Sequence, residues 1–373
     1  LGSALILFFT YFQVQVAVAV NNWYRPFYDA IQNALSNEST TTAGDLYGYM
    51  FSFLILAMTY VLFSVLTSFF VSHYIFRWRT AMHDYYTELL GSMLFQVLGD
   101  DLTIEGILMQ SGGDINMAVC VQTAHGDFFV KWHEGGYEDM MEKEALGLKL
   151  LKKVPGLKVP EVFGHGRLND ISFLVLEFLE RGREDEVYWT RLGEALAELH
   201  RVKGDCFGLD HDNYIGRLQQ CNKPTQDWVS FFAEFRLNAQ LGLAIYNQQV
   251  NQEFVRDFKQ FLHKLPGLMP ESEPSLLHGD LWSGNAFGST KGPALFDPAV
   301  YYGAREMDLA MTRLFGGFNQ RFYEAYDAIY PLPDDFDALV EIYNLYPLMV
   351  HVNLFGANSG YLGSVWRTIK RYI

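Results

Sequence analysis

The stretch His278-Gly279-Asp280-Leu281-Trp282-Ser283-Gly284-Asn285 decides which fold the sequence predicts. Asn285 follows Asp280 by five residues, and a second acidic position, Asp297, follows Asn285 by twelve, inside Phe296-Asp297-Pro298-Ala299. An aspartate can accept a proton from a hydroxyl, and carboxylate and amide oxygens are suitable ligands for Mg²⁺. His-Gly-Asp alone is a weak signal, because Gly-Asp also marks ordinary turns. The two spacings together point to phosphoryl transfer.

The order of these residues is the one that protein kinases use for a catalytic base and two metal ligands. Such a site also needs a lysine that reaches the phosphates and a helical glutamate that fixes the lysine. Lys131 ends the apolar run 128–131, which we expect to form a strand. Glu144, in an expected helix, is the best partner, while Glu142 and Glu138 compete with it by position alone.

Four further positions near these motifs are candidates for the site. Gly112 and Gly113 precede the first expected strand, and glycine backbone N–H groups can approach phosphate oxygens closely; a plain hairpin turn would use the same pair. Trp282 is a candidate floor for a sugar, since sugars pack their apolar faces on aromatic rings, or it is a core residue. We expect His278 to hold backbone in place rather than to act as a base.

Composition restricts the function classes. The chain has 373 residues, 50% hydrophobic and 16% aromatic, which excludes a disordered protein and allows two or three domains. Its formal net charge is −15 and it has no basic patch, so we expect no nucleic-acid partner. Most of that charge lies in residues 93–373. Three scattered cysteines do not make a disulfide framework or a zinc site, which fits a reducing cytosol.

The first ninety residues differ from the rest. Residues 1–24 and 46–76 contain no Asp, Glu, Lys or Arg, and each can supply the roughly 20 apolar residues that a membrane span needs. Gln13 and Gln15 interrupt the first run, so the second is the stronger candidate. A cleaved signal peptide is an alternative for the first run, and buried core helices are an alternative for both. We expect a hairpin of two transmembrane helices.

The flanks of the second run predict its orientation. Arg77-Trp78-Arg79 follows it directly, and the positive-inside rule places that end in the cytosol. The segments Asn21-Asn22-Trp23-Tyr24-Arg25-Pro26-Phe27-Tyr28-Asp29-Ala30-Ile31-Gln32 and Phe69-Phe70-Val71-Ser72-His73-Tyr74-Ile75-Phe76-Arg77-Trp78-Arg79-Thr80-Ala81-Met82 resemble the SbmA/BacA-type bacterial inner-membrane peptide transporters. The resemblance covers residues 1 to about 88, and two helices cannot enclose a transport pathway.

Beyond the membrane pattern, we expect a small mixed lobe over 93–180 and a mostly helical lobe over 181–373, after a helical hairpin over 1–92. Met93 could be the original start of a soluble protein and Gly91-Ser92 a fusion scar; the sequence leaves a natural and an artificial join both open. Periodicity predicts strands at 119–123, 128–132 and 172–178, and helices at 138–153, 189–202, 227–265 and after Asp308.

A second resemblance runs from about Met93 to the C-terminus and is carried by Phe129-Val130-Lys131, His278–Asn285, Phe296-Asp297-Pro298-Ala299, Tyr302-Gly303-Ala304-Arg305-Glu306-Met307-Asp308-Leu309-Ala310 and Leu314-Phe315-Gly316-Gly317-Phe318. In these motifs the chain resembles the fructosamine-kinase / ketosamine-3-kinase family. It implies a protein-kinase-like α+β fold of two lobes with ATP between them. It also implies transfer of the γ-phosphate to the sugar 3-hydroxyl of a ketosamine (a fructosamine or ribulosamine adduct), which begins deglycation repair.

By position, the resemblance assigns a role to each candidate. Asp280 is the base, Lys131 and Glu144 orient the phosphates, Asn285 and Asp297 hold Mg²⁺, and Trp282 lies against the substrate. The backbone at Glu177, Phe178 and Leu179 is the hinge that pairs with adenine. We expect Arg305, Glu306 and Asp308 to cap a helix and brace the metal loop.

Two other interpretations stay open at this point. An aminoglycoside- or choline-kinase-like phosphotransferase shares the His-Gly-Asp and Asn pattern, but Leu281-Trp282-Ser283-Gly284 argues against it. A membrane transport or docking component with a nucleotide-binding body would not need an intact catalytic set. We therefore expect a kinase body in the cytoplasm, attached to the bacterial inner membrane through residues 1–76. The physiological amine, the preferred sugar and the oligomeric state do not follow from the sequence.

Overall fold

The computed structural model describes residues 2–35, 40–110 and 116–373, with side chains from residue 7 onward except 73–82. Two compact units make up the chain, Leu1–Leu89 and Leu90–Ile373. The boundary between them falls inside one long helix. Gly112 and Gly113 lie outside the described residues.

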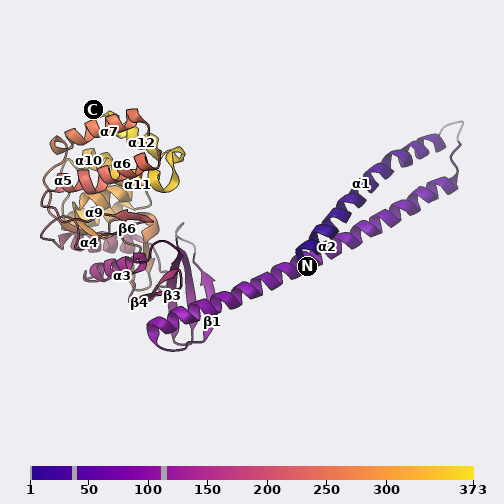
Figure 1. Cartoon of the computed structure of the whole chain (residues 1–373), viewed down its shortest axis with the longest axis horizontal. Helices are drawn as coiled ribbons and strands as arrows, with labels where there is room; N and C mark the ends of the chain where they lie inside the picture. The colour runs from indigo at the N-terminus through magenta and orange to yellow at the C-terminus, as the bar shows by residue number, and fades with distance from the viewer. Residues whose placement is uncertain (1, 36–39, 111–115) are drawn as a thin grey trace. The chain divides into compact units, whose positions relative to one another are not determined.

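The first unit is a helical hairpin. Helix α1 (Gly2–Ala34) runs antiparallel to α2 (Ala43–Leu98), as Figure 1 shows. Phenylalanine rings join them near one end, with Phe9 5.2 Å from Phe70 between ring centroids, and Trp23 donates a hydrogen bond to the carbonyl of Tyr49 near the other. Periodic aromatic residues thus form the seam, as expected for two neighbouring helices.

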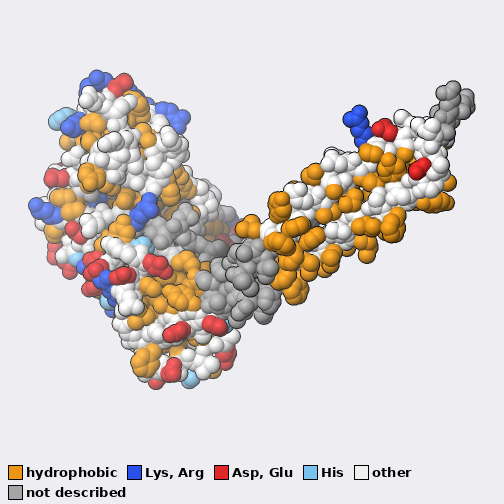
Figure 2. Space-filling model, turned by 45° about the vertical axis from the view of Figure 1, so that its right-hand side comes forward, with side chains coloured by type: hydrophobic (Ala, Val, Ile, Leu, Met, Phe, Trp, Pro, Cys, Tyr) orange, Lys and Arg blue, Asp and Glu red, His pale blue; other side chains and the backbone are white. Residues whose placement is uncertain are grey.

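The outer surface of the hairpin is apolar. Hydrophobic side chains cover much of the face seen in Figure 2. The segment Ala43–Ser72 reaches a mean hydropathy of 2.2 over 18 residues, none of which is buried. Among the described residues, this segment alone combines the length and hydropathy of a membrane span. A second span in residues 1–24 stays a prediction.

The second unit begins with a five-stranded antiparallel sheet in the order β1-β2-β3-β5-β4. Its strands are β1 (Ile104–Met109), β2 (Met117–Thr123), β3 (Gly126–Glu134), β4 (Val162–Leu168) and β5 (Ile171–Glu177), and helix α3 (Met140–Leu151) follows β3. The predicted strands at 119–123, 128–132 and 172–178 match β2, β3 and β5. Lys131 pairs with Ala118 and Leu174 in the centre of the sheet.

The end of α2 belongs to this sheet-containing lobe. Leu90, Met93 and Leu94 have no exposed surface. Strand β4 lies against the last turn, and a Cβ on Gly164 would come 2.8 Å from a methyl group of Val97. Glycine is required where a helix approaches a strand this closely. Residues on both sides of the predicted boundary at 92 and 93 are therefore part of one packed helix.

The remaining residues form a mostly helical lobe. The helices of its first half are α4 (Glu186–Arg201), α5 (Trp228–Phe231), the π-helix Phe232–Asn238, α6 (Ala239–Tyr246), α7 (Gln252–Lys264) and the 3₁₀ turn Leu265–Gly267. Those of its second half are α8 (Glu306–Leu314), α9 (Gln320–Ile329), α10 (Phe336–Tyr343), α11 (Leu345–Phe355), the 3₁₀ turn Ala357–Ser359 and α12 (Tyr361–Lys370). The helix predicted over 227–265 is thus interrupted.

Short strand pairs carry the motif residues. They are β6 (Asn213–Ile215) with β7 (Leu218–Gln220), β8 (Ser275–Leu277) with β11 (Tyr301–Gly303), and β9 (Ala286–Ser289) with β10 (Gly292–Leu295). The β9–β10 hairpin explains the spacing of twelve residues. It starts just after Asn285, ends just before Phe296, and brings the two together so that the Phe296 N–H donates to the Asn285 carbonyl at 3.2 Å.

Candidate active site

Lys131 lies between two carboxylates. Its Nζ is 2.7 Å from an oxygen of Glu144 on α3 and 2.9 Å from Asp297 Oδ1, and Lys131 is 4% exposed. Of the three glutamates that compete by position, the structure places Glu144 against the lysine. Glu138 instead pairs with Arg167. Burial opposes the charge on Lys131, but the carboxylates of Asp297 and Glu144 outweigh it and raise the lysine's pKa, so this group is a cation at neutral pH.

Asp280 and Asn285 contact each other directly. Asn285 Nδ2 donates to the backbone carbonyl of Asp280 at 2.9 Å and to the carboxylate oxygen Oδ2 of Asp280 at 3.1 Å. Burial, and then the negative charge of Asp297, raise the pKa of Asp280 to about 7, although the hydrogen bond from Asn285 opposes the shift. A carboxylate with a pKa near neutrality is suited to general base catalysis.

The Asp297 backbone has a conformation that few side chains adopt. Its φ is 52°, in the left-handed region that normally favours glycine. Such strain persists only where surrounding contacts maintain it, and it gathers at functional sites. The next residues hold the loop, since the Ala299 N–H donates to the His278 carbonyl at 2.9 Å. The two motif loops are therefore tied together through their backbones.

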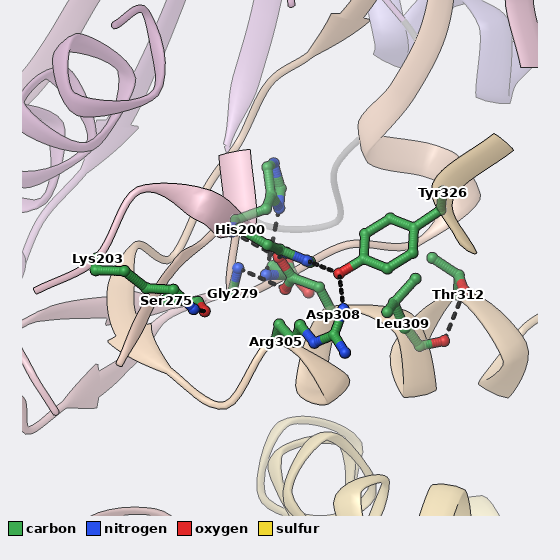
Figure 3. Close-up of polar contacts among 11 residues, drawn as sticks. His200, Lys203, Ser275, Gly279, Arg305, Asp308, Leu309, Thr312 and Tyr326 are labelled. Carbon is green, nitrogen blue, oxygen red and sulfur yellow. Dashed lines mark hydrogen bonds and ion pairs between the residues drawn. The ribbon is translucent and has the colours of Figure 1, made fainter. Parts of the chain in front are cut away.

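Asp308 holds the backbone of the candidate catalytic loop, His278–Asn285, in place (Figure 3). Its two carboxylate oxygens accept hydrogen bonds from the backbone N–H of His278, at 2.7 Å, and of Gly279, at 2.9 Å. Gly279 has φ 82°, and a Cβ there would meet the Ala299 carbonyl oxygen at 2.1 Å. Only glycine fits this position. From the sequence we expected Asp308 to brace the metal loop around Asp297. In the structure its carboxylate holds the His278–Asn285 loop instead.

Two histidines have structural positions around this loop. His278 Nε2 donates to the Phe296 carbonyl at 3.0 Å, and burial lowers the imidazole pKa although Asp308 opposes that shift. A neutral, buried, hydrogen-bonded ring fits the expected structural role. His200 on α4 lies between Asp308 (3.2 Å) and the hydroxyl of Tyr326 (2.8 Å), as Figure 3 shows. Sequence patterns did not single out His200, because its partners are distant in the chain.

One cavity of about 220 Å³ brings the predicted residues together. It is lined by Lys131, Glu144, Asp280, Trp282, Asn285 and Asp297. Trp282 is 40% exposed, and its ring makes an edge contact with Phe315, with 6.3 Å between ring centroids. The cavity wall also includes Asn213, Tyr214, His351 and Phe355, which motif spacing does not reveal.

The predicted hinge is not part of this wall. Glu177, Phe178 and Leu179 are absent from the lining of the cavity, as far as the described residues define it. The Glu177 side chain accepts hydrogen bonds from Lys158 at 2.6 Å and Lys291 at 2.8 Å. Burial opposes ionisation of Glu177, but these lysines lower its pKa to about 2. The side chain therefore ties the sheet lobe to the β9–β10 hairpin, and the backbone role in adenine binding stays a prediction.

The donor set is suitable for a magnesium ion shared with a nucleotide. Among the described residues no three His, Cys, Asp or Glu side chains gather to hold a metal by themselves. Mg²⁺ needs no such cage, because it is usually held by one or two carboxylates plus phosphate oxygens and water. Asp297 supplies a carboxylate, and Asn285, with its Nδ2 directed to Asp280, has its Oδ1 at the other end of the amide.

Comparison with known proteins agrees with this geometry. Residues 87–373 match the profile of the fructosamine kinase family. The chain belongs to this family. A probable ketoamine kinase from Synechocystis sp. is 38% identical over 288 residues, covering 76% of this chain and 96% of the relative. A chloroplastic protein-ribulosamine 3-kinase from Oryza sativa subsp. indica is 38% identical over 284 residues, covering 74% and 81%.

Solved structures show the same relationship. A putative fructosamine-3-kinase from Haemophilus somnus aligns with a TM-score of 0.67 and 30% identity over 76% of this chain and 96% of that one. A second, from Thermobifida fusca, has a TM-score of 0.67 and 31% identity over 74% and 96%. An aminoglycoside phosphotransferase, at 14% identity and a TM-score of 0.52 over 74% and 96%, shares the fold alone.

The membership confirms two predictions. The fold is kinase-like with two lobes, and the protein is an ATP-dependent phosphotransferase. The N-terminal resemblance is confirmed as well, since residues 1–104 match the SbmA/BacA-like family. The two matches overlap at 87–104, where the end of α2 packs into the sheet lobe.

Proposed function

We propose that this fructosamine-kinase family member phosphorylates the sugar 3-hydroxyl of ketosamines. The observation that carries the proposal is the meeting of Lys131, Asp280, Asn285 and Asp297 in one cavity that also exposes an aromatic ring, Trp282. The relatives named ketoamine kinase and protein-ribulosamine 3-kinase support the acceptor class.

In the proposed reaction each of these side chains has one role. The sugar hydroxyl oxygen forms a bond to the γ-phosphorus, the bond from that phosphorus to the β–γ bridging oxygen breaks, and ADP leaves. Asp280 accepts the hydroxyl proton, which its pKa of about 7 permits. Lys131, fixed by Glu144, positions the phosphates, and bound Mg²⁺, held by Asn285 and Asp297, would neutralise phosphate charge.

The acceptor is proposed to lie against Trp282. Trp282, Phe315, His351 and Phe355 form an aromatic surface, with 5.0 Å between the rings of Phe315 and His351 and 5.5 Å between those of His351 and Phe355. Sugar C–H faces pack well on such rings. The nucleotide is proposed to contact Gly112 and Gly113 and the backbone at Glu177, Phe178 and Leu179.

We also propose that the hairpin anchors the kinase to a membrane. The exposed apolar segment Ala43–Ser72 and the match to SbmA/BacA-like proteins support this, and the positive-inside rule then puts residues 90–373 in the cytoplasm. Membrane fractionation of the full chain, with a protease-accessibility assay on the kinase part, tests the attachment and its orientation.

The decisive experiment is ATP-to-ADP turnover by the full chain with fructosyl-lysine, beside an Asp280→Asn variant. We expect turnover that requires both the ketosamine and Asp280, while nucleotide binding to the variant stays normal. Turnover with an aminoglycoside and none with any ketosamine would reject the acceptor. Nucleotide binding without turnover on any acceptor would favour a docking role.

A further inference from the structure

A buried arginine lies behind the site without an acidic partner. Arg236 is part of the π-helix Phe232–Asn238 and has no exposed surface. Within the part of the chain that the structure describes, no carboxylate comes within ion-pair distance of it. Burying an unpaired charge is costly, and π-helical turns often occur at functional sites. Arg236 therefore calls for an explanation beyond packing.

Aromatic rings and carbonyls surround this guanidinium. Its central carbon lies 4.0 Å from the centroid of the Tyr301 ring and 4.6 Å from that of Phe231, so the cation stacks on π-faces. Its Nη1 donates to the Cys221 carbonyl at 2.7 Å, and its Nη2 donates to Asn222 Oδ1 at 2.7 Å. The contact with Asn222 connects Arg236 to other buried amides.

The hydrogen bonds run in one direction from Arg236. Asn222 Nδ2 donates to Asn213 Oδ1 at 2.8 Å, and Asn213 Nδ2 donates to the Val300 carbonyl at 2.8 Å. An arginine side chain has only donors, so Asn222 must turn its oxygen toward Arg236 and its nitrogen toward Asn213. Asn213 must then present its own nitrogen to Val300. The orientation of both amides thus follows from the cation.

A second branch of hydrogen bonds, through Gln220, ends on the Ala299 carbonyl, one residue before Val300. Gln220 Nε2 donates to Asn213 Oδ1 at 2.8 Å and to the Ala299 carbonyl at 3.1 Å. The hydroxyl of Tyr346 donates to Gln220 Oε1 at 2.6 Å, which sets the direction of this amide as well. Both branches therefore end on backbone carbonyls close to Asp297, one on Val300 and the other on Ala299.

We propose that Arg236 is a positioning residue. Through Asn222 and Asn213, and together with the Gln220 branch that Tyr346 directs, it sets the backbone of Ala299 and Val300 and thereby the place of Asp297. The inference rests on the proposed role of Asp297 as a metal ligand. Among the described residues Arg236 Nε is left without a partner. The amides of Asn222, Asn213 and Gln220, however, each have partners for their oxygen and nitrogen. A buried chain of satisfied, polarised amides resists rearrangement. It supplies the outside contacts that keep Asp297 in its left-handed conformation.

The most discriminating variant is Asn222→Asp. An aspartate keeps the shape and accepts from Arg236, and it also gives the buried cation a carboxylate partner. It cannot donate to Asn213 Oδ1, nor to the His211 carbonyl, which accepts from Asn222 Nδ2 at 3.2 Å, so the directed chain is broken after its first step. A role limited to stabilising the fold predicts a change in Tm with hydrogen exchange that changes evenly over the kinase part. A positioning role predicts exchange that becomes faster at 297–302 than in the rest of the kinase part, whatever the change in Tm.

The measurements are made on the full chain in detergent micelles. Hydrogen exchange followed by mass spectrometry reports on the backbone amides of 297–302, thermal unfolding reports Tm, and steady-state assays report kcat and the Mg²⁺ concentration for half-maximal rate. The control is Asp257→Asn, which removes the charge that pairs with Lys370 at 2.6 Å and keeps an oxygen for Trp366 Nε1, away from the cavity lining. Arg236→Lys, which keeps the charge but not the forked donors, and Arg236→Gln complete the set.

For Asn222→Asp we expect exchange of the 297–302 amides to become about tenfold faster while the rest of the kinase part changes less, with kcat about tenfold lower and a raised Mg²⁺ requirement. Arg236→Lys should lie between wild type and Arg236→Gln, and Asp257→Asn should lower Tm without changing exchange at 297–302 or kcat. Unchanged exchange in Asn222→Asp, or faster exchange spread evenly over the kinase part, would overturn the proposal. Because exchange needs no substrate, this result stands apart from whether ketosamines are the acceptors.

Discussion

Lys131 and Asp297, which are 166 positions apart in the sequence, are joined by a 2.9 Å ion pair between Nζ and Oδ1. The same ammonium also contacts Glu144 at 2.7 Å. One cation therefore joins the sheet lobe, the helix α3 and the loop around Asp297. In the proposed phosphoryl transfer, negative charge lies on the phosphate oxygens, and a cation fixed in this way would stabilise that charge and lower the barrier.

Replacing Lys131 by methionine should leave a buried pair of carboxylates without their cation. We expect kcat to fall about 100-fold or more, because a charged donor to the phosphates is lost. Steady-state ATPase-coupled assays measure the change. Lys152→Met is the matched control, since Lys152 pairs with Glu161 at an exposed site and such pairs contribute little. A Lys131 variant with wild-type kcat would remove this residue from the mechanism.

The pKa of Asp280 predicts the acid limb of the pH profile. As a base, Asp280 must be ionised, so kcat/KM should fall about tenfold per pH unit below its pKa of about 7. The measurement is kcat/KM for the ketosamine from about pH 5 to about pH 9. An acid limb that persists unchanged in Asp280→Asn would assign it to another group.

The same pKa shift predicts a stability effect. Because the folded pKa of Asp280 is raised from 3.8 to about 7, the unfolded state ionises first and the fold loses stability as pH rises through that interval. Asp280→Asn removes this penalty. Its Tm should exceed that of wild type by a margin that grows up to about pH 7 and is constant above it. A margin that shrinks with rising pH would contradict the cause given for the shift.

His200 should matter to catalysis through Asp308. His200→Phe removes the closer contact of the Tyr326 hydroxyl and one of the two hydrogen bonds to Asp308 Oδ2, which keeps the His278 N–H, and this should cost about 1–3 kcal/mol of unfolding free energy. His200→Gln can keep a donor toward Asp308 and should retain more kcat than His200→Phe. His263→Phe, at an exposed position on α7, is the control. If both His200 variants keep full kcat with lowered Tm, His200 only stabilises the fold.

Trp282 should affect the acceptor and not the nucleotide. Trp282→Leu removes the exposed ring while keeping the backbone carbonyl that accepts from the Asn285 N–H at 3.0 Å. We expect the KM for fructosyl-lysine to rise about tenfold, roughly 1.4 kcal/mol, with the KM for ATP unchanged. Trp282→Phe should show a smaller rise. Equal changes in both KM values would indicate a general disturbance of the loop.

The packing of α2 predicts where the kinase part can be cut. A fragment from residue 99 lacks Leu90, Met93 and Leu94, whose burial stabilises the lobe by about 1.5–3 kcal/mol each. Compared with a fragment from 83, its Tm should be lower by about 10 °C or more. A fragment from 93, at the boundary that the sequence suggests, should lie between the two. Equal Tm values would show that this helix end does not support the sheet.

Much of the site could be predicted because its information is local. Asp280, Asn285 and Asp297 are separated by a short turn and one hairpin, so their spacing determines how they face each other. Strands β2, β3 and β5 were also predictable, since their apolar runs are bounded by turn residues. Strand β4 was not, because its glycines and charges suit a close helix contact that only packing reveals.

The buried polar partners were out of reach of sequence patterns. His200 meets Tyr326 across 126 positions, and Asn213 meets Val300 across 87. No local periodicity marks a residue whose role depends on a distant carbonyl. The choice of Glu144 over Glu142 as the partner of Lys131 is similar, because it depends on which face of α3 turns toward the sheet.

By itself, then, the sequence determined the chemistry of the motif loops and the apolar character of the N-terminal hairpin, because spacing and composition act over a few residues. The tertiary structure alone decided which groups hold those loops: Asp308 below His278 and Gly279, and the amides of Asn213 and Gln220 behind Asp297. The physical reason is that buried hydrogen-bonding groups must be satisfied, and in this protein their partners come from segments that only folding brings together.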